Sequence, residues 1–317
     1  MSGNTCFSAS SFTNPDDHAR GIAHFNQQYL QTGPGRFEGF VQTFSLDPGV
    51  VAYQEQVNVP TLQQGIMRKG WRTFGIPVRP DSSGTLQGRV VGATIAHFSA
   101  TRDFVAQSSR PADHIGIVVG DNTFVTYADY LGGADSLGWQ DHTLLEISGE
   151  ARERAAASIS QCLQAAYGNL EALAQPAARV AMRDDILEIL FCLLIDAKPP
   201  RRRNEVTRLA YSEIVNRSRE HLLATPNQPV GVLELSRLLR VSRRTLQTSF
   251  LEVAGVTPHV YLRAIRLTWV HRLLRQTSAD RLSIKDAAAR WGFVNMGKFA
   301  AQYREMFGYL PSETIRA

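Results

Sequence analysis

The sequence predicts an α+β protein: a β-rich N-terminal domain that ends in a pair of helices, followed by an all-α domain of two helix-turn-helix units. Short apolar stretches between glycine and proline turns fill the first third of the chain. Helical spacing of apolar residues begins near Glu150, and only short helical patterns follow Lys198. The 317 residues are too many for one ordinary core and sufficient for two domains.

The composition is that of a globular protein, with 44% hydrophobic and 20% charged residues. The polar start, Met1–Ser11, has neither the basic nor the apolar segment of a secretion signal. The longest apolar run, Ile186–Ile195, contains Glu188 and falls short of the ~20 residues of a membrane span. Three cysteines lie far apart and form no CxxC pair: Cys6, Cys162 and Cys192. We therefore expect a cytoplasmic protein with no membrane contact, no disulfide framework and no zinc knuckle.

The net charge of +5 conceals an asymmetry between the two parts of the chain. From Lys198 onward there are 21 Lys and Arg against 9 Asp and Glu, a net charge of +12. The residues up to Ala197 hold 13 against 20, a net charge of −7. This division is typical of a polyanion-binding segment joined to a domain that binds something else, although a basic surface without a partner would look the same.

The N-terminal part is predicted to consist of strands. Between Arg36 and Ser99, apolar stretches alternate with turn residues such as Asp47-Pro48-Gly49 and Pro60. Further strands are expected over residues 89–98, 115–119 and 123–127. Helical spacing then begins over 150–173, and Pro176 opens a second helix whose apolar face includes Ile186 and Leu190. This helix pair fits either a dimer contact or ordinary core packing.

The segment 198–205 is predicted to be a linker, because two prolines and three arginines interrupt the periodicity there. The domains are therefore expected at 1–197 and 206–317. The second domain begins with a helix over Val206–Ala224 that ends before Pro226 and Pro229.

An internal repeat organises the second domain. Its first unit has a short helix from Val232, a break at Ser242 and a second helix with Leu246 and Phe250 on one face. Ser242 is a suitable N-cap, because its hydroxyl can accept from free amides of the next turn. Fifty-three residues after Leu246 and Phe250 the same marks return, at Phe299 and Tyr303, with Gly308 and Pro311 matching Gly255 and Pro258. Gly292 stands where a helix-turn-helix requires a sharp turn.

The outward faces of the two second helices carry polar side chains that can read base edges in the major groove of double-stranded DNA. The expected base contacts are Ser242, Arg243, Arg244, Gln247 and Thr248 in the first unit and Asn295, Met296, Lys298 and Gln302 in the second. A connecting helix of roughly 26 Å would hold the units about one DNA turn (~34 Å) apart. Phosphate contacts are expected from Arg263, Arg266 and Lys285, although a solvated role fits these residues equally.

These marks resemble the AraC-type DNA-binding domain over about residues 207–317. The resemblance is carried by the run from Ser283 to Phe293, by Phe299, Tyr303, Phe307-Gly308 and Pro311-Ser312, and by the segments 241–246 and 258–267. It implies a transcription regulator, by family habit an activator that contacts RNA polymerase. Gly297 departs from the pattern, since it stands where the family often has a polar residue, so the second unit is expected to read fewer bases.

The N-terminal part is similar, through Gly33–Phe37 and Phe74–Pro77, to the regulators that resemble the ethanolamine-utilisation activator. The resemblance implies an effector-sensing and dimerisation domain, hence a homodimer controlled by a small molecule of unknown identity, with an ethanolamine-like amine as one candidate. Trp71, Phe74 and His97 are possible residues of the effector pocket, but each fits a packed core position better.

Two other classes of protein remain as alternatives. A metal-dependent β-rich enzyme with a helical accessory domain would need clustered histidines, but His97, His114 and His142 form no His-x-His pair. A Gly-x-Ser-x-Gly turn, a phosphate loop and a dinucleotide motif are also absent from the sequence. We therefore expect no catalysis, no cofactor and no metal. The other class depends on a protein partner. It is either a regulator that a protein partner controls instead of a small molecule, or a pure interaction protein that binds a partner through its C-terminal helices.

Overall fold

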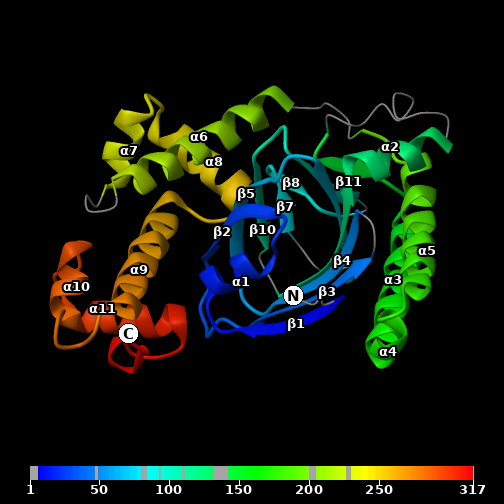
Figure 1. Ribbon diagram of the computed structural model, residues 1–317. Helices are drawn as coiled ribbons and strands as arrows, with labels where there is room; N and C mark the ends of the chain where they lie inside the picture. Colours follow the sequence, from blue (N-terminus) through cyan, green and yellow to red (C-terminus); the bar gives the residue numbers. More distant parts are fainter. Residues whose placement is uncertain are drawn as a thin grey trace.

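The computed structural model describes the chain except for residues 1–5, 47–48, 80–83, 93, 109–110, 131–141, 200–204, 226–229 and 317. It shows a β-sandwich with a helical layer on one side and an all-α domain on the other (Figure 1). The α+β prediction is therefore confirmed. None of the helices in the described ranges is long and apolar enough to cross a bilayer.

One sheet of the sandwich has seven antiparallel strands. Its order is β1 (Phe7–Phe12), β3 (Gly39–Leu46), β4 (Val50–Val57), β11 (Ala112–Gly120), β6 (Trp71–Pro77), β9 (Thr94–Ser99) and β12 (Leu144–Glu146). The second sheet has the order β2 (Phe25–Gln31), β5 (Thr61–Met67), β10 (Phe104–Ser108), β7 (Gly84–Leu86) and β8 (Arg89–Val90). The short helix α1 (Pro15–Gly21) packs on β2 and on the β1–β3 edge of the first sheet.

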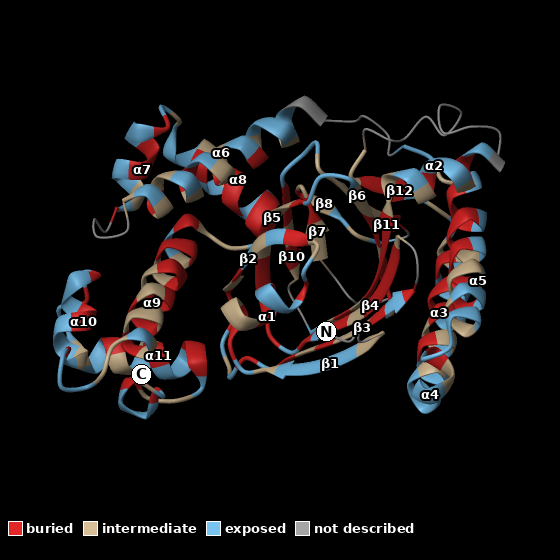
Figure 2. Ribbon diagram, in the orientation of Figure 1, coloured by how far each residue is buried: buried red, intermediate tan, exposed pale blue. Residues whose placement is uncertain are grey.

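The seven-stranded sheet is buried on both faces. Successive side chains of a strand point to opposite sides, so each strand contributes to two cores. Val51 and Tyr53 of β4 face the second sheet, whereas Val50 and Ala52 face the helical layer. That layer contains α2 (Asp121–Tyr130), α3 (Gly149–Gly168), α4 (Leu170–Leu173) and α5 (Pro176–Ile195). The buried sides of α3 and α5 face the sheet (Figure 2). Many of the apolar residues of α3 and α5 therefore belong to the hydrophobic core.

Two predictions about the N-terminal elements are wrong. Residues 123–127 lie in α2, not in a strand, because Phe124 and Ala128, one helical turn apart, are both fully buried. The single strand expected over 89–98 is two strands, β8 and β9, which belong to different sheets. β-branched and aromatic residues favour strands only weakly, and burial of Phe124 and Ala128 decides for helix here.

The C-terminal domain consists of α6 (Glu205–Ala224), α7 (Val232–Leu238), α8 (Arg243–Ala254), α9 (Pro258–Gln276), α10 (Ile284–Arg290), α11 (Met296–Phe307) and the 3₁₀ turn η2 (Pro311–Glu313). It has two small cores. One gathers residues of α6, α7 and α8 together with Leu62 of β5 and Val105 of β10. The other gathers residues of α10 and α11, and α9 contributes to both. The predicted order of helices is confirmed.

Both ends of the predicted linker, 198–205, take part in regular structure. Lys198, its predicted first residue, exchanges two backbone hydrogen bonds with Glu146 of β12. Glu205, its predicted last residue, already belongs to α6. Residues 200–204, the middle of the predicted linker, lie outside the described residues.

Candidate nucleic-acid interface

The first helix-turn-helix unit is formed by α7 and α8. Arg240 takes the left-handed backbone conformation in the turn, with φ of 55°. Ser242 then caps α8, its Oγ accepting from the amide of Thr245 at 3.0 Å, as predicted. Leu246 and Phe250 are fully buried and hold α8 against its own core.

The opposite side of α8 is open to solvent. Ser242, Arg243, Arg244 and Gln247 are exposed, and Thr248 is half-buried. The first turn thus presents two arginines and an amide on a helix whose position is fixed by its buried face. This is the geometry that direct base readout in the major groove requires.

The second unit repeats the arrangement with α10 and α11. Gly292 makes the turn with φ of 75°, a conformation that a residue with a side chain adopts only at a steric cost. Phe299 and Tyr303 are buried at the positions that match Leu246 and Phe250. Lys298 is exposed and Gln302 half-buried.

Two residues of the second unit also make structural contacts. Asn295 caps α11, its Oδ1 accepting from the amide of Lys298 at 2.9 Å. Met296 is half-buried against the second core and so is not directed outward. Asn295 stands three residues before Lys298, as Ser242 stands three residues before Thr245. The preference of asparagine for the N-cap position could have indicated this role from the sequence.

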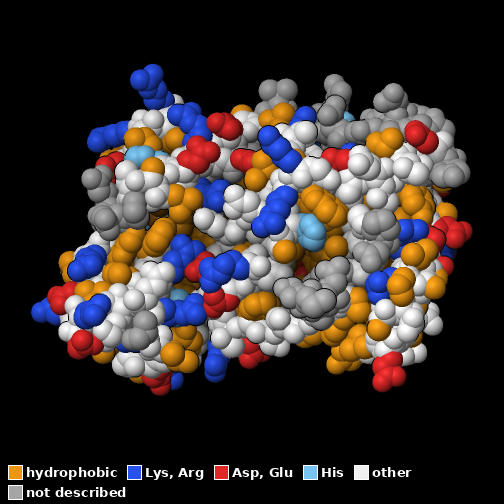
Figure 3. All heavy atoms as spheres, viewed as in Figure 1, with side chains coloured by type: hydrophobic (Ala, Val, Ile, Leu, Met, Phe, Trp, Pro, Cys, Tyr) orange, Lys and Arg blue, Asp and Glu red, His pale blue; other side chains and the backbone are white. Residues whose placement is uncertain are grey.

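The connecting helix α9 presents its arginines in different ways. Arg263 is half-buried, and Arg266 lies over the ring of Phe293 at 5.2 Å. Burial, with the charge of Arg263, lowers the pKa of Arg266. Lys285, on α10, is exposed. Lys and Arg side chains are numerous over the C-terminal helices on the left of Figure 3.

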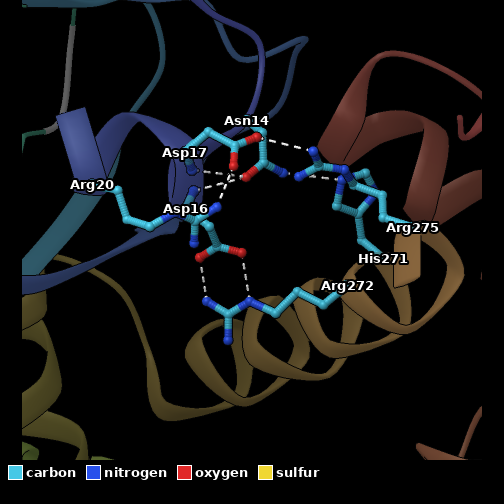
Figure 4. A network of polar contacts seen from close by, with 7 residues as sticks. All are labelled: Asn14, Asp16, Asp17, Arg20, His271, Arg272 and Arg275. Atoms are coloured by element: carbon cyan, nitrogen blue, oxygen red, sulfur yellow. Dashed lines mark hydrogen bonds and ion pairs between the residues drawn. The ribbon is translucent and has the colours of Figure 1, made fainter. Parts of the chain in front are cut away.

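The far end of α9 is joined to α1 by a cluster of polar contacts, which we name the α1–α9 clamp (Figure 4). Both carboxylate oxygens of Asp16 accept from Arg272, the Nε contact being 2.6 Å. Asp17 accepts from Arg275 at 2.9 Å. Asn14 caps α1 through its Oδ1, and its Nδ2 lies 3.2 Å from Nε2 of His271.

The clamp continues into the second unit. The Nδ1 of His271 lies 2.7 Å from the hydroxyl of Tyr303, which also contacts the hydroxyl of Thr314 at 2.7 Å. Burial and the charge of Arg275 lower the pKa of His271 to about 4, so the ring is neutral near pH 7. The N-terminal domain is thus coupled to the buried face of α11.

A cavity of about 90 Å³ lies between the two sheets. Aromatic side chains form much of its wall, including Phe25, Tyr53 and Phe98. Its charged group is Glu55, whose Oε1 accepts from His18 at 2.8 Å and from Tyr29 at 2.6 Å. Burial would raise the pKa of Glu55, but these hydrogen bonds and the charges of His18 and His114 outweigh burial and lower it.

The residues proposed from the sequence for an effector pocket lie elsewhere. Phe74 and His97 stack on each other, 5.1 Å between centroids, on the face of the sheet that the helices cover. Trp71 packs edge-on against His24, and none of these three lines the cavity. In strand β6 the alternation directs Gly75, not its neighbour Phe74, toward the cavity.

Two residues that line the cavity also contact α8 or the residue that ends it. The hydroxyl of Thr85 lies 3.4 Å from the carbonyl oxygen of Val253 in the last turn of α8. The side-chain amide of Gln107 packs on Gly255, coming within 2.7 Å of where a Cβ would stand. The wall of the cavity is therefore also part of the interdomain contact.

Comparison with known proteins agrees with this geometry. Residues 235–317 match the family model described as a helix-turn-helix domain. The chain is 38% identical over 87 residues to the XylDLEGF operon transcriptional activator of Pseudomonas putida, covering 27% of each chain. Residues 235–317 form a helix-turn-helix domain. We call it the AraC-type domain, after the resemblance that its sequence carries. It contains most of α7 together with α8, α9, α10 and α11.

Two further proteins are similar to parts of this chain. The probable thc operon regulatory protein of Rhodococcus erythropolis is 35% identical over 103 residues, which are 32% of this chain and 31% of that one. A solved structure of a probable AraC family transcriptional regulator from Rhodopseudomonas palustris is 31% identical over 33% of this chain and 99% of its own, with a TM-score of 0.29. The chain covers less than a third of the length of the two curated relatives.

Proposed function

We propose that this chain is a sequence-specific DNA-binding transcription regulator, acting in the cytoplasm. The observation that supports this best is the pair of capped helices α8 and α11, whose apolar faces are buried and whose first turns expose Arg243, Arg244 and Lys298. In such an arrangement the exposed side chains read bases and the remaining basic surface supplies affinity. Activation is the direction of control that the name of the XylDLEGF operon transcriptional activator favours, and RNA polymerase is the partner that we propose for it.

Arg244→Ala in the full chain tests this function. We expect a loss of about 1–3 kcal/mol, roughly 5- to 150-fold in affinity, on the specific site and relaxed preference at one base position. Selection on genomic fragments at two salt concentrations, followed by titration of the selected site, measures both. Arg154→Ala, an exposed arginine of α3, is the control that should change neither. Equal weakening on every sequence would make Arg244 a phosphate contact only.

We further propose that a small molecule in the cavity controls DNA binding, and that two chains pair through the N-terminal domain. Thr85 and Gln107 support the first part, because they line the cavity and also touch α8. An occupant would then change the docking of the first unit if its affinity differs between the docked and undocked states. Exposed apolar side chains on α3 and α5, such as Tyr167 and Val180, favour that helix pair as the dimer contact.

An ethanolamine-like amine is the effector that the N-terminal resemblance favours, and Glu55 supplies a carboxylate for it. Ethanolamine hydrochloride should raise the melting temperature of the full chain in a saturable way. Ethylene glycol, which lacks the charge, should not, and Glu55→Gln should remove the effect of the amine. If ethanolamine and ethylene glycol act alike, or the substituted chain still responds, the amine assignment is wrong.

A further inference from the structure

A second hollow, unlike the cavity, lies between the two domains. It is a cleft of about 740 Å³ bounded by the turn between β1 and α1, the segment after β2, and the end of the AraC-type domain. Four arginines contribute to its wall, from both domains: Arg36, Arg275, Arg304 and Arg316. We name this hollow the arginine cleft.

The two sides of the arginine cleft are held at a fixed separation. The backbone of Arg36 packs directly on Gly308, within 2.9 Å of where a Cβ would stand. The amide of Gly35 donates to the carbonyl oxygen of Glu305 at 3.0 Å, and the side chain of Gln31 donates to the carbonyl oxygen of Met306. Gly308 ends α11 with φ of 79°. Arg36 is therefore anchored at the C-terminal end of the second recognition helix.

Positive charge in the arginine cleft is only partly balanced. Arg275 pairs with Asp17 at 2.9 Å, and Arg316 donates to the carbonyl oxygens of Thr277 and Leu282. In the described ranges of the chain, no ion pair involves the guanidinium group of Arg36 or of Arg304.

The acidic residue that lines the arginine cleft, Glu313, already accepts from the amide of Leu310 at 2.6 Å. His271 is neutral and adds no charge. Burial raises the pKa of the Tyr309 hydroxyl, and the positive charges of Arg275 and Arg36 oppose that rise. Arginines of both domains thus line the arginine cleft together with Tyr309.

We propose that the arginine cleft binds a small anion bearing a phosphate or carboxylate group, which bridges Arg36 of the N-terminal domain and Arg304 of α11. Guanidinium groups suit both anions because their planar donors match two oxygens at once. The site is distinct from the base-reading end of α11, since Arg304 lies nine residues after Asn295, about 14 Å along the helix. A bound anion would stabilise the docked arrangement of the domains.

Inorganic phosphate, with the full chain and no DNA, is the first probe. Calorimetric titration and thermal unfolding are done at constant ionic strength, with sodium chloride as the replaced salt. We expect saturable phosphate binding and a higher melting temperature, with the affinity at least tenfold lower in Arg36→Gln and in Arg304→Gln. Arg281→Gln, an exposed arginine outside the arginine cleft, is the matched control and should bind as the parent chain does. Succinate in place of phosphate separates carboxylate from phosphate recognition.

Three results would overturn the proposal: no saturable binding of either anion, an equal response to chloride, or unchanged affinity in both substituted chains. Circular dichroism of Arg36→Gln and Arg304→Gln distinguishes loss of the site from loss of the fold, and restored binding in Arg36→Lys would exclude a folding defect at that position. Since DNA is absent from the titration, failure of Arg244→Ala to affect DNA recognition leaves this result unchanged, and the two proposals fail separately.

Discussion

Replacing Asp16 by arginine is expected to undock the AraC-type domain from the N-terminal domain. Asp16 and Arg272 are largely buried, with side-chain exposures of 17% and 19%, and the carboxylate accepts two hydrogen bonds from the guanidinium group. Removing one partner of a buried pair costs about 3–5 kcal/mol, because the other charge stays behind without compensation. Two arginines facing each other add repulsion. The Asp17–Arg275 pair is more exposed and is expected to contribute little.

Small-angle scattering and denaturant unfolding of the full chain measure this effect. Undocking should raise the radius of gyration and separate one unfolding transition into two. Asp103→Arg, at an exposed acid before β10, is the control for the change of charge alone. The combination of Asp16→Arg with Arg272→Asp should restore both values. If Asp16→Arg behaves like Asp103→Arg, the α1–α9 clamp does not hold the domains together.

The AraC-type domain is the part of the fold that the sequence predicts best, because its elements carry local marks. Ser242 indicates the start of α8, and the helical spacing of Leu246 and Phe250 indicates its buried face. The internal repeat then predicts α11 from α8. A capping residue and an apolar stripe act within a few residues of one another, so they can be recognised without knowledge of the tertiary structure.

The α1–α9 clamp could not be predicted in this way. Asp16 and Arg272 are 256 residues apart, and nothing in either local sequence indicates the other. In the sequence, Arg272 is one more basic residue on a helix. The pairing depends on how the two domains dock, and docking depends on contacts between distant surfaces such as Gln107 and Gly255.

The cavity between the two sheets shows a different limit of sequence-based prediction. Phe74 and Gly75 are neighbours in β6, yet they face opposite sides of a sheet that is buried on both. When both faces are apolar, hydrophobicity does not distinguish the face toward the helices from the face toward the cavity. Glu55 was the available exception, since a carboxylate within a predicted strand needs a reason, and it lines the cavity.

Phe250→Ala is expected to abolish DNA binding, although Phe250 lies on the buried face of α8 and not on the face that is open to solvent. The ring is fully buried and packs edge-on against Tyr261, 4.9 Å between centroids. Truncation of a buried phenylalanine to alanine costs about 3–5 kcal/mol, through lost transfer free energy and an unfilled cavity. Phe250 is among the large side chains that hold α8 in this core, so α8 should lose its fixed position.

The neighbouring residue provides the control. Leu251 is 46% exposed on the other side of α8, so Leu251→Ala should change stability by about 0.5 kcal/mol or less and leave DNA binding intact. Thermal unfolding and titration of the selected DNA site, measured on both variants, compare the two effects directly. Loss of binding only in Phe250→Ala would mean that recognition requires a helix held rigidly from behind. Equal retention of binding would mean that DNA itself orders α8, and that the buried face is dispensable for recognition.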